Sequence, residues 1–145
     1  MKPLVCTLIT CAMATGTAIA GEKEDSIRLV GEASTLAAKD KAAALAEISN
    51  PKGRFVMGEV YVFAFDLTGT VVAHPINSKL IGKNTYEVPD VNGKLWRKEA
   101  IDTVKAKGEV SVDYKYKNPI NGMLEDKVTY CKKATDLAIC AGYYK

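Results

Sequence analysis

Two alternating stretches joined by a short polar turn, at residues 59–75, constrain the fold of this chain more than any other segment. Aromatic side chains recur at every second position of the first stretch, with Val and Ala between them, which is typical of a β-strand packed on both faces. The intervening Asp-Leu-Thr-Gly has the chemistry of a type I turn. The resulting hairpin pairs Phe63 with Val72 and Tyr61 with His74, unless a one-residue bulge shifts the register.

This register places His74, the only histidine of the chain, beside Tyr61 on an aromatic face. A titratable imidazole next to a phenol, on a surface lined by aromatic rings, indicates a pocket for a small ligand. His74 is therefore the first candidate ligand-binding residue, because an imidazole can donate a hydrogen bond to a carboxylate. The alternative is a core or turn histidine that is bonded to the backbone.

An uncharged and mostly apolar run follows Lys2 and continues to Ala20. Small residues at its end fit the cleavage pattern of a secretory signal peptide. We therefore predict that residues 1–20 are removed and that residues 21–145 form one periplasmic domain. An uncleaved membrane anchor is one alternative, although Gly16 interrupts the apolar run. Lipidation at Cys11 is another, although Thr10 fits a lipidation motif poorly.

Two of the four cysteines, Cys131 and Cys140, remain in the exported chain, where oxidation is expected. Their flanks, residues 127–133 and 137–144, look like the arms of a hairpin, and a bend at Thr135 and Asp136 places the cysteines opposite each other. We predict a disulfide that stabilises the fold by about 2–3 kcal/mol. A redox-active pair would need C-x-x-C spacing, and two sulfurs with a distant histidine do not form a convincing zinc site.

Two further segments predict helices. Residues 25–49 are rich in Ala, Leu, Lys and Glu, can be capped by Asp25 or Ser26, and end at an Asn-Pro-Lys-Gly sequence. Their apolar stripe at helical spacing consists of Ile27, Val30, Ser34, Ala37, Ala44, Leu45 and Ile48. Residues 94–106 predict a second, shorter helix that ends at Gly108. One side of this helix carries Trp96, Ala100, Ile101 and Val104.

The remaining pattern completes an α+β plan. Residues 109–117 alternate cleanly, with Val110, Val112, Tyr114 and Tyr116 on one face. Residues 76–92 contain several turn formers and no clear period. The order is a long helix, two strands, an irregular segment with a helix, and three antiparallel strands, which is typical of an α+β fold with a five-stranded sheet.

Charge and motif content exclude several functions. The chain has 20 Lys and Arg residues against 17 Asp and Glu residues, and the two signs are interspersed. Without a basic stripe, we predict no nucleic-acid partner. The sequence has no G-x-S-x-G, H-E-x-x-H, P-loop or dinucleotide fingerprint. We therefore predict a protein that is not an enzyme and has neither a cofactor nor a metal site.

A series of short motifs follows one another along the exported chain. In order they are Tyr61-x-Phe63-x-x-Asp66-x-x-Gly69, Ala73-His74-Pro75, Gly82-Lys83-Asn84, Asp90-x-Asn92-Gly93-Lys94, Gly108-Glu109-Val110-x-Val112-Asp113-Tyr114, Asn118-Pro119, Lys127-Val128-x-Tyr130 and Ala141-Gly142-Tyr143-Tyr144. Their order and spacing resemble the single Cache domain family (type 2) of extracytoplasmic sensors, over essentially all of residues 21–145.

The resemblance implies a PAS-like antiparallel sheet behind the long N-terminal helix, with a pocket between the sheet and the segment that crosses it. It also implies a small-molecule ligand, often a short carboxylate, and a ligand-binding role for Lys127. Tyr61, Tyr114 and Tyr116 offer hydroxyl groups on apolar bodies, which suits the lining of such a pocket. Trp96 is a candidate pocket wall, although it and the tyrosines suit a plain core equally well.

Cache domains are commonly the outer half of membrane receptors, flanked by spanning helices. After the predicted signal peptide, this sequence has no second apolar segment of spanning length. We therefore expect a free-standing periplasmic sensor for signal transduction such as chemotaxis, with a membrane receptor as its partner. The alternative is a structural or adaptor protein without a small ligand, whose partner surface lies on residues 25–49. This alanine-rich helix can also pair with a copy of itself, so a homodimer is a further prediction.

Overall fold

The computed structural model describes residues 21–145, so the predicted signal peptide lies outside the described residues. The described chain forms, in order, α1 (Glu22–Lys39), α2 (Lys41–Ile48), β1 (Val56–Met57), β2 (Val60–Asp66), β3 (Val71–Ala73), the 3-10 helix η1 (Ser78–Leu80), α3 (Trp96–Lys107), β4 (Glu109–Lys117), β5 (Leu124–Ala134) and β6 (Leu137–Tyr144). Within this described part, no helix has the length and apolar character needed to cross a bilayer.

The strands form one antiparallel sheet in the order β1-β2-β6-β5-β4. The short strand β3 also pairs with β2 and is not part of this linear order. The α+β, PAS-like prediction is confirmed, with six strands in place of five. The additional strand, β1, has only two residues, which is too short to leave a period in the sequence.

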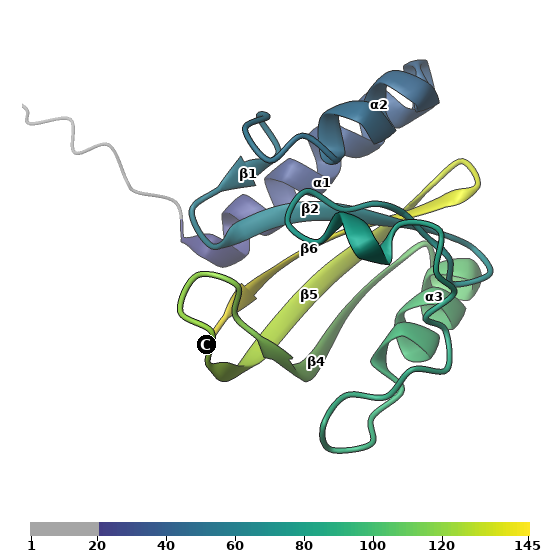
Figure 1. The fold of residues 1–145 in the computed structure, drawn as a ribbon. Helices are drawn as coiled ribbons and strands as arrows, with labels where there is room; N and C mark the ends of the chain where they lie inside the picture. The colour runs from purple at the N-terminus through teal and green to yellow at the C-terminus, as the bar shows by residue number, and fades with distance from the viewer. Residues whose placement is uncertain (1–20) are drawn as a thin grey trace, which may run out of the picture.

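The helices cover the two faces of this sheet (Figure 1). On one face α1 and α2 pack an apolar core in which Leu29, Val30 and Ile48 are fully buried. On the other face, α3 and the segment that joins β3 to α3, residues 74–95, cover a second core that is rich in aromatic rings. We call this second side the aromatic face and residues 74–95 the crossing segment. The candidate site lies on the aromatic face.

Residues 25–49 form two helices, so the prediction of a single helix is wrong. At the break, Asp40 has an extended backbone (φ −150°, ψ 95°), and its carboxylate accepts a hydrogen bond from the backbone N–H of Ala43, 3.0 Å away. Asp40 thereby caps α2, as short polar side chains do at helix starts. The first helix also begins earlier than Asp25, with Gly21 as its N-cap. Ile27, predicted to be in the apolar stripe, is exposed.

The hairpin of β2 and β3 has a bulge between Ala64 and Phe65, which pair with Ala73 and Val71. The predicted pairings of Phe63 with Val72 and of Tyr61 with His74 are therefore wrong, although the rings of Tyr61 and His74 remain neighbours. The loop is one residue longer than predicted, because the Asp66 N–H donates to the carbonyl of Thr70, and the Asp66 carboxylate accepts hydrogen bonds from the backbone N–H groups of residues 68 and 70 inside it.

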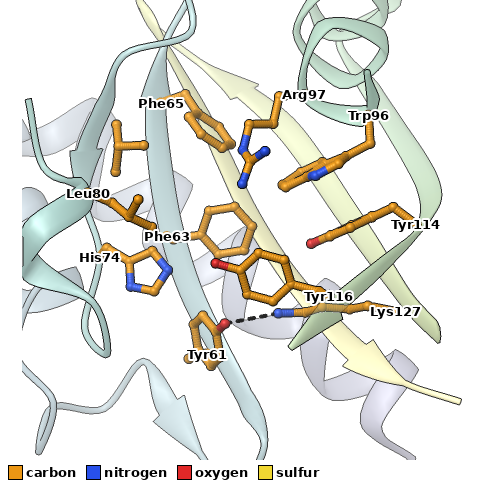
Figure 2. Close-up of a pocket in the computed structure, with 11 residues that line it drawn as sticks. Tyr61, Phe63, Phe65, His74, Leu80, Trp96, Arg97, Tyr114, Tyr116 and Lys127 are labelled. Carbon is orange, nitrogen blue, oxygen red and sulfur yellow. Dashed lines mark hydrogen bonds between the residues drawn. The ribbon is translucent and has the colours of Figure 1, made fainter. Parts of the chain in front are cut away.

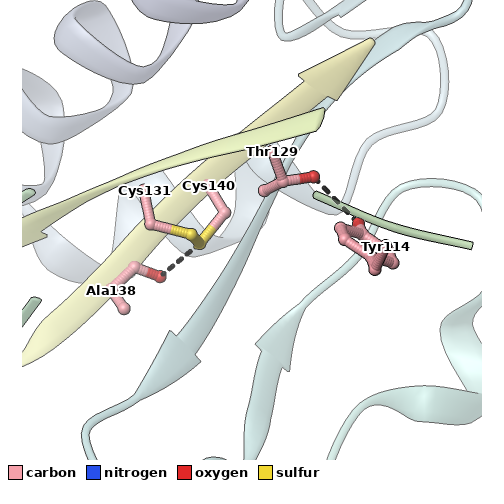
Figure 3. The surroundings of a disulfide bond; sticks show 5 residues. All are labelled: Tyr114, Thr129, Cys131, Ala138 and Cys140. Atoms are coloured by element: carbon pink, nitrogen blue, oxygen red, sulfur yellow. Dashed lines mark hydrogen bonds between the residues drawn. A yellow bond between two sulfur atoms is a disulfide. The ribbon is translucent and has the colours of Figure 1, made fainter. Parts of the chain in front are cut away.

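The predicted terminal hairpin is confirmed. Cys131 on β5 lies directly opposite Cys140 on β6, and the two form a disulfide (Figure 3). The bond lies on the aromatic face, two residues along β5 from Thr129, which is hydrogen-bonded to Tyr114 on β4. The disulfide therefore ties β5, which carries Lys127 of the site, to the central strand β6.

Candidate functional site

A pocket lies on the aromatic face between β2, the strands β4 and β5, the start of α3 and the crossing segment (Figure 2). It is lined by Tyr61, Phe63, Phe65, Val71, His74, Leu80, Trp96, Arg97, Tyr114, Tyr116 and Lys127. These include all six residues that the sequence predicts for ligand binding, and the structure brings them together. Their contact with a ligand stays a prediction.

The register of the sheet places Lys127 at the floor of the pocket. Lys127 on β5 lies between Tyr114 on β4 and Tyr144 on β6. Its side chain passes over Gly142, where an added Cβ would lie 2.9 Å from Lys127 Cε. Because Gly142 pairs with Tyr61 on β2, the ammonium group reaches across β6 and donates a hydrogen bond to the Tyr61 hydroxyl at 3.1 Å.

Lys127 is a buried cation in an aromatic cage. Its side chain is 1% exposed, and Nζ lies 4.3 Å from the ring centre of Tyr61 and 4.9 Å from that of Tyr144. Burial lowers the pKa of Lys127 to about 7, because charge is costly away from water. Among residues 21–145, no acidic side chain pairs with it.

Arg97 is a second buried cation in the pocket wall, and the sequence analysis missed it. Its guanidinium lies 4.4 Å from the ring centre of Trp96 and donates a hydrogen bond to the carbonyl of Val88 at 3.2 Å. Burial lowers the pKa of Arg97. The signal that would have found it is helical spacing, since Arg97 precedes the core residue Ile101 by four positions on the same side of α3.

His74 presents a neutral imidazole to the pocket. Its Nδ1 accepts hydrogen bonds from the backbone N–H groups of Ile76 and Asn77, at 3.2 and 3.0 Å. The ring proton therefore lies on Nε2, which faces the pocket interior (Figure 2). Burial, together with the nearby charges of Lys127 and Arg97, lowers the pKa of His74 to about 4. The predicted neighbour Tyr61 lies beside it, with 5.3 Å between the ring centres.

The other predicted residues form the aromatic wall. Trp96 stacks on Tyr114 with 3.8 Å between ring centres and 7° between the planes. The Tyr114 hydroxyl lies 2.8 Å from the Thr129 hydroxyl, so a hydrogen bond inside the sheet already occupies it. Tyr116 packs edge-on against Tyr114. Burial raises the pKa of Tyr61 and Tyr114, so both remain neutral hydroxyls at ordinary pH.

Two aspartates outside the pocket hold its walls in place. Asp90 accepts hydrogen bonds from the backbone N–H groups of Asn92, Lys94 and Lys115, and so ties the loop before α3 to β4. This anchor fixes the point at which Trp96 and Arg97 enter the pocket. Asp66 organises the turn after β2 in the same manner. Acidic residues therefore support the site without lining it.

The pocket narrows inward and widens outward. The inner cavity is small, with a volume of about 20 Å³. Tyr61, His74 and Tyr116 also line a wider outer cleft of about 420 Å³, bounded by residues 76–77 and 117–122. The three shared side chains stand at the junction of the two spaces.

The chemistry of the lining favours an anion. The lining residues carry two cations, a neutral N–H donor on His74 and tyrosine hydroxyls, and none of them is Asp or Glu. Positive charge without a counter-ion in an apolar setting is stabilised when an anion enters. Over the described chain, no group of three or more His, Cys, Asp or Glu side chains is placed to hold a metal ion.

Several solved structures share this fold. The chain is similar to a methyl-accepting chemotaxis protein from Vibrio parahaemolyticus RIMD 2210633, with 23% identity over 84% of this chain and 87% of that one, at a TM-score of 0.70. It is similar to the periplasmic sensor domain of a chemotaxis protein, with 26% identity over 85% and 89% of the two chains, at a TM-score of 0.67.

A third similar structure is a Cache chemosensory domain that recognises carboxylic acids, with 24% identity over 85% of this chain and 92% of that one, at a TM-score of 0.71. A comparison with curated proteins finds no match. Residues 33–145 match the family model described as Cache domain. The chain belongs to the Cache domain family.

Proposed function

We propose that residues 21–145 act as one periplasmic Cache domain that binds a small carboxylate and senses it for a membrane partner. The role is one of binding rather than catalysis. A free-standing sensor of this kind would report its bound state to a receptor in the membrane. The three similar sensor domains support this assignment, because two belong to chemotaxis proteins and one recognises carboxylic acids.

The observation that carries the proposal is the pair of buried cations, Lys127 and Arg97, in a pocket whose lining contains no acid. A buried charge without a partner is costly. A carboxylate that displaces water from this pocket would receive charge-assisted hydrogen bonds, which contribute roughly 1.5–3 kcal/mol each. The Nε2 proton of His74 would supply a neutral donor to the same group.

A second candidate function is a structural or adaptor protein without a small ligand. The observation that favours it is the small inner cavity of about 20 Å³, which the aromatic side chains nearly fill. On this view, the aromatic face is a plain core, and α1 with α2 carries the partner surface. A homodimer through α1 is compatible with either candidate function. Light scattering of the purified protein tests it.

Thermal unfolding of the purified protein with acetate, propionate, pyruvate and lactate distinguishes the two candidates. A ligand at 100 times its dissociation constant stabilises the folded state by about 2.7 kcal/mol. We expect at least one of these acids to raise the melting temperature. No shift across the panel would overturn the proposal in favour of the structural role.

Matched variants test whether the ligand-induced rise in melting temperature depends on the pocket residues. Lys127→Met and Arg97→Met should each remove the ligand-induced shift while the protein still unfolds cooperatively. Lys98→Met is the control, because Lys98 is the neighbour of Arg97 on α3 but bonds to the Tyr86 hydroxyl outside the pocket. A shift that survives both pocket substitutions would place the ligand elsewhere on the molecule.

A further inference from the structure

The inner pocket has room for the head of a ligand and for little more. Its 20 Å³ of space for the centre of a water-sized sphere corresponds to about one water molecule. A carboxylate group can take the place of such a water beside Lys127 and His74. The body of any larger acid must then lie on the far side of the junction formed by Tyr61, His74 and Tyr116.

The outer cleft has the size of a small-molecule site. Its volume of about 420 Å³ lies within the range of roughly 300–1,000 Å³ in which proteins bind small organic ligands. It adjoins the inner pocket, because three side chains line both spaces. An extended ligand that passes between these three side chains would occupy both spaces.

The lining of the outer cleft is suited to an apolar body. Besides the aromatic rings at the junction, its lining includes the apolar Ile76 and Pro119, the polar Asn77 and Asn118, Gly122, and one charged residue, Lys117. Ile120, on the loop that forms this wall, is exposed although it is apolar. Exposed apolar side chains beside an open cleft, such as Ile76 and Ile120, are typical of a ligand-binding groove.

Both walls of the cleft are already held in place. Asn118 is fully buried, and its amide donates hydrogen bonds to the carboxylates of Glu59 and Glu125, at 3.2 and 3.0 Å. The opposite wall is held by His74, whose Nδ1 accepts from the backbone N–H groups of Ile76 and Asn77. The ring that would donate to the head of the ligand through Nε2 thus also positions the wall of the cleft.

We propose that this protein selects carboxylates with an apolar tail, with the carboxylate in the inner pocket beside Lys127 and His74 and the tail in the outer cleft. This inference rests on the proposed function and adds the class of ligand to it. It predicts that affinity rises with the length of the chain. Burial of one methylene group in a half-open cleft should increase affinity by about twofold to fourfold.

The test is isothermal titration calorimetry of the purified protein with acetate, butanoate and hexanoate. Hexanoate has four methylene groups that acetate lacks, so we expect it to bind at least about tenfold more tightly. Asn77→Trp places a large ring in the cleft and keeps the backbone N–H that His74 accepts. In this variant, hexanoate should bind no more tightly than acetate.

Two controls define the effect of the added bulk. Asn77→Ala changes the same position without filling the cleft and should retain the gain with chain length. Lys79→Trp adds the same ring on η1, at an exposed position outside the lining of the cleft, and should also retain it.

The outcomes separate the inference from the proposed function. Acetate binding without a gain for hexanoate, or a gain that survives Asn77→Trp, overturns the apolar-tail inference and leaves the carboxylate sensor standing. Absence of binding by all three acids overturns the apolar-tail inference, and the proposed function falls with it only if pyruvate and lactate also leave the melting temperature unchanged.

Discussion

Lys127 is the residue at which stability and the proposed function conflict. An ammonium group buried without a counter-ion destabilises the folded state, and burial lowers the pKa of Lys127 to about 7. The Tyr61 hydroxyl and the surrounding rings compensate part of this cost. A carboxylate in the pocket would remove most of the remainder, so ligand binding and the charge of this side chain are coupled.

The affinity for a carboxylate should therefore depend on pH above neutrality. A bound anion raises the pKa of Lys127, so binding above pH 7 must be accompanied by proton uptake. We expect nearly constant affinity for acetate between pH 6 and about 7, and up to tenfold weaker binding for each further pH unit. Titration calorimetry in buffers of different ionisation enthalpy measures both the dependence of affinity on pH and the number of protons taken up on binding.

Two variants control this measurement. Lys127→Met should remove the slope together with most of the affinity, whereas Lys98→Met should preserve the profile of the wild type. The tyrosines around Lys127 do not contribute, because burial raises the pKa of Tyr61 and Tyr144. A flat profile up to pH 9 would show that the ammonium group does not contact the ligand.

The two nitrogens of His74 can be tested separately. The amide oxygen of His74→Asn can replace Nδ1 as the acceptor for Ile76 and Asn77, but this variant lacks the Nε2 donor. We expect its stability to stay within about 1 kcal/mol of the wild type and its affinity for acetate to fall roughly tenfold. His74→Gln keeps a donor near Nε2 but frees the two backbone N–H groups, so it should mainly lose stability. Equal affinity losses in both variants would contradict these separate roles.

His74 should also make stability depend on pH. Because burial lowers the pKa of His74 to about 4, the unfolded chain binds more protons than the folded one between pH 6.5 and about 4. The stabilisation is therefore complete above pH 6.5 and is lost as the pH falls through this window, by up to about 3 kcal/mol. His74→Asn should lack this loss in urea unfolding, and an identical pH profile in both proteins would contradict the assignment.

The residues of the site differ in how far the sequence predicts them. His74 and Tyr61 follow from alternation in a short hairpin, and the bulge that shifts their ladder leaves them adjacent. Lys127 could be predicted only from the resemblance, because nothing in its local sequence separates a buried lysine from an exposed one. Arg97 was missed because its burial depends on how α3 packs on the sheet, which is a tertiary contact.

At the scale of the elements, the close approach of β5 and β6 gives Lys127 its direction. A Cβ at position 142 would lie 2.6 Å from the carbonyl oxygen of Val128 and would also meet the hydroxyl of Thr129. Only glycine leaves room for the lysine to cross β6 toward Tyr61. Gly142 is thus a positioning residue for a side chain on the neighbouring strand.

We expect Gly142→Ala to lower the free energy of unfolding by about 1–3 kcal/mol, because a backbone atom must move to accept the methyl group. It should also raise the pKa of Lys127 by displacing the amine toward water, a change that NMR titration of the side chain can follow. Gly31→Ala on α1 is the control, since nothing lies within 4 Å of its added Cβ. This control should be neutral or stabilising by up to about 1 kcal/mol. A lysine pKa still near 7 in Gly142→Ala would contradict the positioning role.

The sequence predicts the type of each helix or strand better than the residues at which it begins and ends. The strands β4, β5 and β6 and the disulfide are predicted correctly, because alternation and the opposed cysteines restrict the register to one choice. The break at Asp40 was missed, since an apolar stripe continues through it and a single capping bond decides the local backbone. The bulge in β2 depends in the same way on the carboxylate of Asp66.

At the scale of the whole molecule, the two faces of the sheet carry different tasks. The face under α1 and α2 is an apolar core, whereas the aromatic face includes two buried cations and the pocket. Substitutions in the first face, such as Leu29→Ala, should reduce stability and leave affinity unchanged. The second face is where improved stability and lost function should coincide, as is common at binding sites.

Lys127→Met tests this conflict in a single substitution. Between pH 7 and about 10.5 the unfolded chain carries a proton on Lys127 that the folded chain lacks, so wild-type stability rises with pH across this window. Below pH 7 the folded state bears the full cost of the buried charge. We therefore expect Lys127→Met to be more stable than the wild type at pH 6, by about 1–4 kcal/mol in urea unfolding, with a difference that shrinks toward pH 9.

Lys105→Met, at an exposed position on α3, should change little at either pH. A variant less stable than the wild type at pH 6 would mean that the bond to Tyr61 and the surrounding rings outweigh the cost of burial. The pocket would then be stable without a ligand, as the structural role requires.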